Sequence, residues 1–166
     1  MNVVFRPGVR EDLAAVLEIE RASFRHPWPT SAFETELENS VATFKVAVEG
    51  RKVIGYYDLW CAGGDAHLLN IAVAAARRGR GWGRHLLTDA IATATAAGAD
   101  RLFLEVRPSN VAAVRMYERA GFTHVRRRRR YYEDGEDADV MALTLKPEPE
   151  QGGESGRQRT PRTRWS

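Results

Sequence analysis

The feature of this 166-residue sequence that most constrains its fold is a glycine-rich turn set between an apolar segment and an amphipathic one. Residues 66–73 are almost continuously apolar, which is typical of a central, buried strand. Three glycines follow in the turn at 79–83, and apolar side chains then recur at helical spacing over 83–97, with Gly98 as the expected C-cap. This pattern predicts a strand that leads directly into a helix packed on a sheet.

The remaining periodicities predict a strand, two helices and a hairpin before this unit, and a strand, a helix and two strands after it. Capping-box spacing between Ser31 and Glu34 indicates where the second helix begins. The resulting fold class is a single α/β domain with a mixed, mostly antiparallel sheet of about seven strands and about four helices on its two faces. The additional strands are expected at 3–6, 44–48, 53–61, 101–106, 123–131 and 139–145, and the additional helices at 13–24, 31–39 and 110–120.

Composition separates a domain at residues 1–145 from a tail at 146–166. The tail carries Pro, Gly, Glu and Arg without apolar periodicity, so we expect it to be disordered. It holds five basic and three acidic residues, +5 − 3 = +2 of the formal net charge of +3, which leaves the domain nearly neutral. We therefore expect no direct nucleic-acid binding, and the lack of a membrane-length apolar run or an export leader favours a cytoplasmic protein that does not bind membranes.

The glycine-rich turn is suited to binding a phosphate. Backbone N–H groups at a helix N-terminus are free to bind an anion, and glycines allow close approach of the backbone. Four arginines, at 77, 78, 80 and 84, add positive charge, although a solvated surface loop would show the same residues. A nucleotide P-loop is excluded because no Gly-Lys-Ser/Thr is present, and the glycine spacing disfavours a dinucleotide fold despite Glu105 at the end of the next strand.

Several motifs around this turn resemble one family. The element Arg78-x-x-Gly81-x-Gly83 is similar to the pyrophosphate-binding signature of the GNAT-type N-acyltransferase superfamily. The wider pattern closely resembles the bacterial RimI-type ribosomal-protein-alanine N-acetyltransferases and covers residues 3–145. The motifs that extend the resemblance are His26-Pro-Trp28, Leu69 to Val73, Leu104 to Asn110, Met116 to Phe122, Tyr131-Tyr132 and Glu136 to Ala138.

The resemblance implies an enzyme that transfers an acetyl group from acetyl-CoA, without a metal, in a ternary complex. It implies Glu105 as the general base, directly or through a water, and Tyr117 as the acid that returns a proton to the coenzyme A sulfur. It also implies Trp28 as an acceptor-side residue, with ordinary core packing as the alternative, and a ribosomal protein with an N-terminal alanine as the partner. The cofactor-binding residues that it implies are Ile71, Ala72, Val73, Arg78, Gly79, Arg80, Gly81, Trp82, Gly83, Arg84 and Asn110.

The residues alone leave simpler interpretations open for both catalytic candidates. Alternation in the strand at 101–106 places Glu105 on the face opposite Leu102 and Leu104, where a solvated glutamate is the plain alternative. Tyr117 is equally explained as an aromatic side chain packed between helix and sheet. The four histidines (His26, His67, His85 and His124) and Cys61 show no metal-ligand spacing, and we interpret them as structural.

The acceptor amine is constrained by chemistry. An α-amine has a pKa of about 7.7 to 8.0 against about 10.4 for lysine, so neutralising lysine costs roughly 3.5 kcal/mol more near pH 7. This difference favours a protein N-terminus. Acetylation of lysine, a polyamine or another small amine remains an alternative, as does a non-catalytic module that binds coenzyme A or a dinucleotide.

Two charged segments near the C-terminal end of the domain remain. Residues 126–130 are five consecutive arginines, but strand alternation divides such a run between two faces, which disfavours a nucleic-acid patch. The acidic residues at 133–139 prompt the hypothesis that this turn, with Tyr131 or Tyr132, grips a basic peptide N-terminus.

Overall fold

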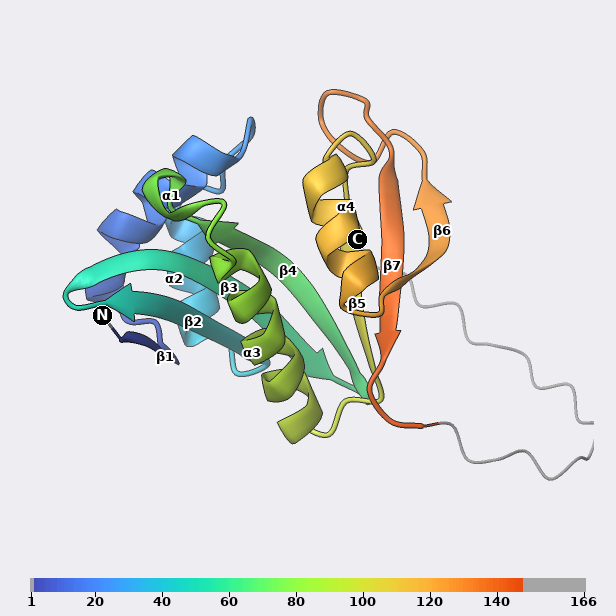
Figure 1. Ribbon diagram of the computed structural model, residues 1–166, viewed down its shortest axis with the longest axis horizontal. Helices are drawn as coiled ribbons and strands as arrows, with labels where there is room; N and C mark the ends of the chain where they lie inside the picture. The colour runs from blue at the N-terminus through green and yellow to red at the C-terminus, as the bar shows by residue number, and fades with distance from the viewer. Residues whose placement is uncertain (1, 148–166) are drawn as a thin grey trace, which may run out of the picture.

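The computed structural model describes residues 2–147 and confirms the predicted fold class. Within these residues seven strands form one sheet in the order β1-β2-β3-β4-β5-β7-β6 (Figure 1). All neighbouring strands are antiparallel except β4 and β5, which run parallel. The strands are β1 (Val3–Pro7), β2 (Ala42–Glu49), β3 (Lys52–Ala62), β4 (Asp65–Val73), β5 (Arg101–Val106), β6 (Thr123–Arg128) and β7 (Ala138–Thr144).

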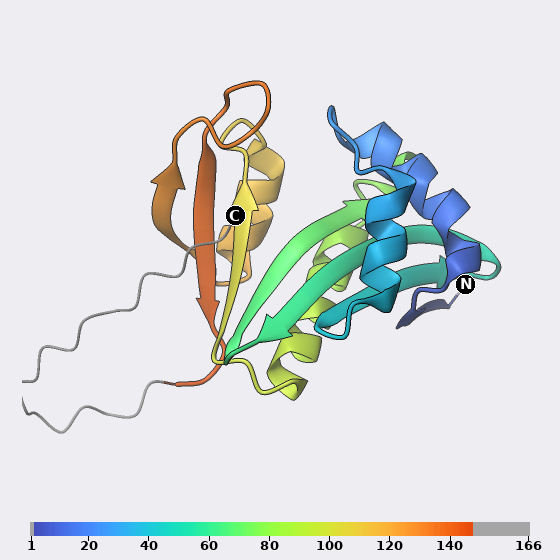
Figure 2. The same cartoon turned by 180° about the vertical axis from the view of Figure 1, so that it is seen from behind.

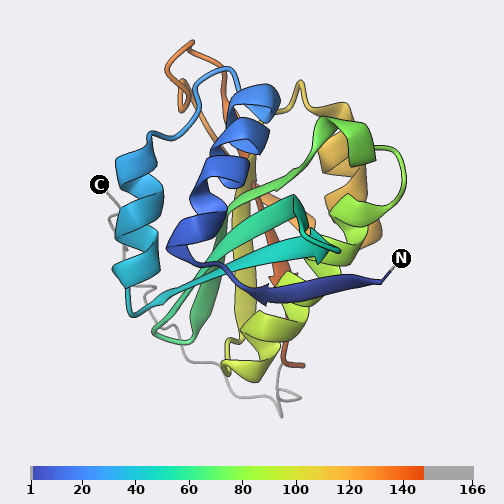
Figure 3. The same cartoon turned by 90° about the vertical axis from the view of Figure 1, so that its left-hand side faces the viewer.

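Helices cover both faces of the sheet (Figure 3). The α-helices α1 and α2 pack on one face, and α3 and α4 pack on the other. Two short 3-10 turns, η1 and η2, precede α1 and follow β4. The helical elements are η1 (Arg10–Asp12), α1 (Leu13–Ser23), α2 (Thr30–Glu38), η2 (Ala75–Arg77), α3 (Trp82–Ala96) and α4 (Val111–Arg119).

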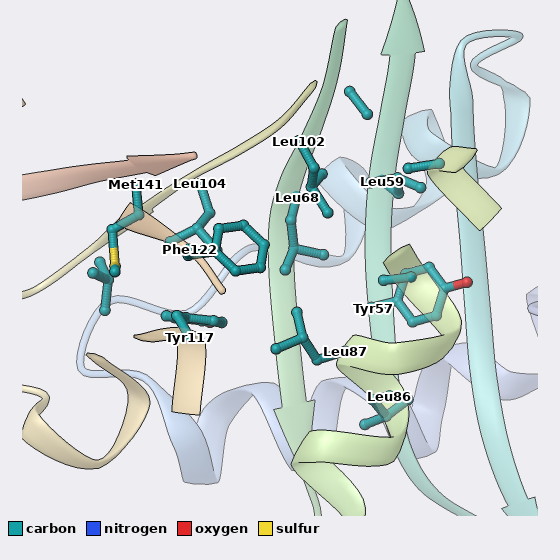
Figure 4. Close-up of a cluster of buried hydrophobic side chains, with 14 of the residues drawn as sticks. Tyr57, Leu59, Leu68, Leu86, Leu87, Leu102, Leu104, Tyr117, Phe122 and Met141 are labelled. Atoms are coloured by element: carbon teal, nitrogen blue, oxygen red, sulfur yellow. The ribbon is translucent and has the colours of Figure 1, made fainter. Parts of the chain in front are cut away.

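Side chains that point to opposite faces of the sheet divide the interior into two cores. On β3, Tyr56 packs toward α1 and α2, whereas Tyr57 packs toward α3, and both are fully buried. The core under α3 and α4 includes Leu86, Leu104 and Tyr117 (Figure 4). Because a fully buried large apolar side chain stabilises a fold by roughly 1.5 to 3 kcal/mol, these two layers hold the strands that carry the site.

Three local predictions differ from the structure. Helix α2 begins at Thr30 with Pro29 as its N-cap residue, so Ser31 lies inside the helix and makes no capping bond. Phe24 follows α1 and is 37% exposed, so it does not extend the apolar face of that helix. Strand β6 ends at Arg128 rather than Tyr131, because Arg130 adopts a φ of 49° and its amide binds Asp137, which turns the chain.

No helix among residues 2–147 combines the length and apolar character needed to cross a membrane. The predicted tail lies almost entirely outside the described residues, since only Lys146 and Pro147 belong to both. The domain limit at residue 145 and the disorder of 146–166 therefore stay predictions.

Three acidic side chains, Glu20, Glu36 and Asp58, are buried between the sheet and helices α1 and α2. Glu20 accepts hydrogen bonds from the Tyr56 hydroxyl, from Asn70 Nδ2 at 3.0 Å and from the Trp28 amide at 2.9 Å. This network ties the segment after α1 to β4.

The other two buried acids, Glu36 and Asp58, differ in their hydrogen bonding. Trp60 Nε1 donates to Glu36 Oε2 at 2.6 Å, whereas neither carboxylate oxygen of Asp58 has a hydrogen-bond partner among the described residues. Burial, followed by the nearby Glu36 carboxylate, raises the pKa of Asp58 to about 8. Asp58 is thus a buried acid that favours its neutral form.

The stability of the fold should therefore depend on this carboxyl. Unfolded Asp58 ionises near pH 4 and folded Asp58 near pH 8, so its stabilising contribution is complete below pH 4 and is lost as pH rises to 8. We expect Asp58→Asn to raise the free energy of unfolding at pH 8 by on the order of 3 kcal/mol and to do little at pH 4. Urea unfolding at both pH values measures this, with Asp65→Asn at the start of β4 as the control. Equal effects of Asp58→Asn at pH 4 and pH 8 would contradict the assignment.

Candidate active site

The site is organised by the point at which strands β4 and β5 separate. Their parallel pairing ends at Leu68 opposite Leu104, and beyond it the two strands diverge (Figures 1 and 2). On its other edge, β4 stays paired with β3, but Asp58 pairs with Asn70 and the next residue of β3 pairs with Leu68. Leu69 is therefore the extra residue of a β-bulge. From Leu69 to Val73 one edge of β4 has no strand partner among residues 2–147, and its backbone can bind an extended ligand.

A run of free amides lies just beyond this edge. Gly79 and Gly81 have φ angles of 73° and 84°, and Gly81 is the N-cap residue of α3. The first amide to bond back into the helix is that of His85, to the Gly81 carbonyl. The amides of residues 79–84 thus have no backbone acceptor within the described chain. A turn of this kind, at the positive end of the helix dipole, fits a diphosphate.

The four arginines near this turn are not equivalent. Arg77 is paired with Glu49, and Arg78 donates to the Val73 carbonyl at 3.0 Å and to Ser23 Oγ at 2.8 Å. Arg78 therefore ties the turn to β4 and α1. The guanidinium groups of Arg80 and Arg84 have no ion pair or hydrogen bond to any residue between 2 and 147, so they are the two available to a phosphate.

Gly83 and Asn110 hold α3 and α4 in place. A Cβ atom on Gly83 would lie 3.3 Å from the sulfur of Met116 on α4, so glycine permits the close approach of the two helices. Asn110 caps α4 as predicted, with its Oδ1 accepting from the Ala113 amide at 3.2 Å. Trp82, the first residue of α3, packs beside His85 and against the core.

The candidate base, Glu105, is neither solvated nor isolated. Its side chain is 13% exposed and faces away from the core of Leu102 and Leu104, as strand alternation predicts. Glu105 Oε2 lies 2.6 Å from His67 Nε2 on β4, and Oε1 lies 3.3 Å from Arg128 Nη1 on β6. The structure therefore brings Glu105 together with two side chains that the sequence did not connect to it.

The candidate acid, Tyr117, is buried on the opposite face of the sheet. Its ring packs against Phe122 with centroids 5.8 Å apart, and the two rings lie together in Figure 4. Burial is the main reason that the pKa of Tyr117 is raised above its usual value. Its hydroxyl has no hydrogen-bond partner among the described residues. The hydroxyl oxygen is not fully buried, so it can be reached by a ligand. The packing role and an available hydroxyl are therefore both present.

Glu105 and Tyr117 lie on opposite faces of the sheet, and the opening between β4 and β5 joins the two faces. Ile71 and Val73 pack toward α3 and α4, whereas Ala72 packs toward α1 and α2. A ligand that follows the free edge of β4 can thus be approached from both faces. This arrangement suits a reaction in which one group removes a proton and another supplies one.

A cavity of about 370 Å³ lies on the Glu105 face, beside α2. Trp60, which lines it, is the register partner of His67. Trp28, an expected acceptor-side residue, also lines it and packs on Phe33 with centroids 5.4 Å apart. The lining residues are Trp28, Pro29, Ala32, Thr35, Glu36, Trp60 and Leu69.

The two tyrosines predicted on the acceptor side sit at the other end of the site, in the loop after β6. Tyr131 and Tyr132 form an edge-to-face pair with centroids 5.0 Å apart. Arg128 lies 5.2 Å from the Tyr131 ring centroid, and Arg107 lies 3.9 Å from that of Tyr132. Burial raises the pKa of Tyr132 to about 12. Tyr131 is 46% exposed, so one face of this pair is open to a ligand.

The acidic turn is occupied mainly by partners within the chain. Arg107 binds Asp134 and Glu136, Ser109 also binds Glu136, and Arg127 binds Asp139. The Glu136 amide, followed by Arg107, lowers the pKa of Asp134, and Ser109, followed by Arg107, lowers the pKa of Glu136. The turn also contacts the segment after α1, through Arg25 with Asp134 at 3.5 Å and His26 with Glu133 at 3.2 Å. Its acids therefore mainly brace loops, and two members of the five-arginine run bind different carboxylates, Arg127 that of Asp139 and Arg128 that of Glu105.

His67 is the residue of the site that the sequence interpretation missed, since it was taken as structural. A signal was present, because His67 alternates with the buried Ala66 and Leu68 and so shares a face with Glu105. Recognising it required knowing that β4 and β5 are neighbours. No cluster of three or more potential metal ligands occurs among residues 2–147.

Comparisons with known proteins agree with this geometry. Residues 13–122 match the model of the Acetyltransferase (GNAT) family. The [ribosomal protein bS18]-alanine N-acetyltransferase of Escherichia coli K12 is 36% identical over 137 residues, covering 81% of this chain and 92% of that protein.

Solved structures give the same result. The crystal structure of the Escherichia coli ribosomal-protein-S18-alanine N-acetyltransferase superposes with a TM-score of 0.82 at 31% identity, covering 90% of this chain and 98% of that one. The yncA protein of Salmonella typhimurium, solved with acetyl-CoA, has a TM-score of 0.76 at 22% identity, covers 90% and 97%, and supports the fold alone. The family match, the free amides of the turn and the open edge of β4 lead to one conclusion: the chain belongs to the GNAT family of acetyltransferases and is an acetyl-CoA-dependent N-acetyltransferase.

Proposed function

We propose that this enzyme acetylates the N-terminal alanine of a small-subunit ribosomal protein, by direct transfer from acetyl-CoA in a ternary complex. The observation that carries the proposal is the free edge of β4, which runs from the open amides at 79–84 to the bulge beside Glu105. The named activity of the Escherichia coli relative supports the acceptor. A ribosomal substrate also favours a cytoplasmic location.

Acetyl-CoA would be held by three parts of the chain. The amides of Gly79 to Arg84 and the guanidinium groups of Arg80 and Arg84 would bind the diphosphate, because they lack partners elsewhere among the described residues. Backbone groups of Ile71, Ala72 and Val73 would bind the extended pantetheine and the acyl carbonyl. Arg78 would hold the turn against β4, and Asn110 would contact the cofactor from the start of α4.

The proton transfers would be divided between the two faces of the sheet. Thioester aminolysis requires a neutral amine and a proton for the departing sulfur. Removal of the amine proton would depend on Glu105, on the face that carries the 370 Å³ cavity. Tyr117 would return a proton to the sulfur, since its buried hydroxyl keeps its proton at neutral pH and has no partner among residues 2–147.

The acceptor would enter on the Glu105 face, between Trp28 on one side and Tyr131 and Tyr132 on the other. Arg25 and His26 join the loops that carry these aromatic residues. A chain N-terminus fits such a site because its amine loses a proton more easily than lysine. The acids of the turn are braced by Arg107 and Arg127, so the aromatic faces rather than the carboxylates would make most of the contact.

An assay of thiol release from acetyl-CoA tests this function. Three acceptors are compared: a peptide that starts with alanine, the same peptide with a blocked N-terminus but a free lysine, and a polyamine. We expect release with the first peptide alone and a mass increase of one acetyl group at its N-terminus. Equal release with the blocked peptide or with the polyamine would contradict the N-terminal assignment. Coenzyme binding without any release would instead indicate a binding module.

A further inference from the structure

His67 and Glu105 make a short polar contact in the candidate active site. Nε2 of His67 and Oε2 of Glu105 are 2.6 Å apart, on the face of the sheet that carries the acceptor cavity. The His67 side chain is 30% exposed, so it is accessible from solvent. Its register partner Trp60 lines that cavity, as does Leu69, two residues further along β4.

The contact defines which nitrogen of His67 can accept a proton. An ionised carboxylate only accepts hydrogen bonds, so the hydrogen between the two groups belongs to Nε2. In the neutral ring Nδ1 then carries the lone pair, and within residues 2–147 it has no hydrogen-bond partner. A carboxylate that fixes one imidazole tautomer and leaves the other nitrogen basic is a recurrent arrangement for general-base catalysis.

Arg128 strengthens this interpretation. Its Nη1 lies 3.3 Å from the second oxygen of Glu105. Two hydrogen bonds, one to each oxygen, fix the orientation of the Glu105 carboxylate, so that Oε2 stays directed at the imidazole. The charged groups around His67 are Glu105 from β5, Arg128 from β6 and, through Trp60, Glu36 from α2, and the titratable but neutral Tyr131 lies beyond β6 against Arg128. Of these groups, Glu105 is the one whose carboxylate contacts the imidazole ring directly.

We propose that His67 is the proton acceptor of the reaction and that Glu105 holds and stabilises it, so that the two act as one pair. The proposal rests on the function proposed above and identifies the base within it. It makes His67 a catalytic residue and Glu105 a residue that acts mainly through the imidazole.

The proton balance of the step is complete. The acceptor ammonium gives one proton to Nδ1 of His67, and the freed electron pair of the amine forms the C–N bond to the acyl carbon. The C–S bond breaks with its electron pair on sulfur, which takes a proton from Tyr117. A second nitrogen proton returns to the Tyr117 oxygen through solvent, the third remains on the amide, and His67 releases its proton to solvent.

The test uses the full chain with acetyl-CoA and the alanine-starting peptide. We expect His67→Gln to lower kcat at pH 7 by at least tenfold while the KM for acetyl-CoA stays within twofold. The fall of kcat/KM in acid should lose the midpoint characteristic of an imidazole. In His67→Ala, added imidazole should restore several-fold activity, and it should do nothing for the wild type or for Glu105→Gln.

A matched control exists on the surface. His124 lies on β6, two strands away from β5, and pairs with Glu118 of α4 at 3.1 Å on the face of the sheet opposite Glu105, so His124→Gln should leave kcat unchanged. Circular dichroism checks that each variant folds. Independently, the ¹H–¹⁵N spectrum of the wild type should show His67 with its hydrogen on Nε2, and Glu105→Gln should change that signal.

The outcomes separate the two proposals. If the wild type acetylates the peptide and His67→Gln keeps its kcat and the shape of its pH profile, Glu105 acts alone and the pair is wrong. An Nδ1–H tautomer in the spectrum would also overturn it. A wild type that releases no thiol with any amine refutes the proposed function, and with it the reaction in which the pair would act.

Discussion

Replacing Glu105 with Gln is expected to lower kcat/KM for an alanine-starting peptide by about 10²- to 10⁴-fold, the usual contribution of a positioned acid–base group. The amide keeps the size of the side chain but can neither accept a proton nor stabilise a cationic His67. It also leaves Arg128 without its carboxylate partner. Steady-state thiol release measures the change, and the affinity for acetyl-CoA should be nearly unaffected because Glu105 lies away from the free amides of the turn.

The control for this variant is Glu118→Gln. Glu118 also faces a histidine, His124, but on the exposed side of α4, so its loss should change kcat/KM less than twofold. A Glu105→Gln enzyme with a tenth or more of the wild-type kcat/KM would remove Glu105 from the proton-transfer machinery. A similar loss in both variants would indicate a general effect of charge instead.

Gly81→Val is expected to weaken the binding of coenzyme A by about 10- to 100-fold. Gly81 has a φ of 84°, which a β-branched residue adopts only with a strain of roughly 1 to 3 kcal/mol. Relief of that strain would rotate the turn and point its amides away from the diphosphate. Each hydrogen bond lost to a charged group costs about 1.5 to 3 kcal/mol, which corresponds to one to two decades in Kd. Calorimetric titration with coenzyme A measures the effect.

Gly50→Val is the matched control. Gly50, at the tip of the β2–β3 hairpin, also has a positive φ, of 64°, and a Cβ atom added to either glycine would meet no other atom within 4 Å. The two variants should lose similar stability on thermal unfolding, but only Gly81→Val should lose coenzyme affinity. Unchanged binding in Gly81→Val would mean that the turn at 79–84 does not hold the diphosphate.

Much of the fold could be read from local patterns. The hairpin of β2 and β3, the strand β5, the cap at Asn110 and the positive-φ Gly98 just after the C-cap residue of α3 follow from alternation and from residues with special backbone preferences. Predictions failed where a neighbour in space decided the outcome. Strand β6 stops at Arg128 because Asp137 binds the amide of Arg130, and no property of the arginine run indicates that bond.

The candidate site shows the same division. Residue type and order were enough to select the glycine turn, whereas Glu105 and Tyr117 became candidates only through the resemblance of the motifs around them to the family. The partners of Glu105 come from β4 and β6, whose positions beside β5 depend on strand order and register. The burial of Asp58 and the bracing of the acidic turn by Arg107 likewise arise from segments distant in the chain.

The sequence by itself determined the succession of strands and helices, the glycines of the turn at 79–83 and the face of β5 on which Glu105 lies. These features depend on backbone preferences and on periodicity, which act over a few residues. Only the tertiary structure decided that β4 leaves β5 at Leu68, that Leu69 forms a bulge and that His67 reaches Glu105. Those facts depend on register between strands, which is decided by the packing of two cores and is not contained in any single segment.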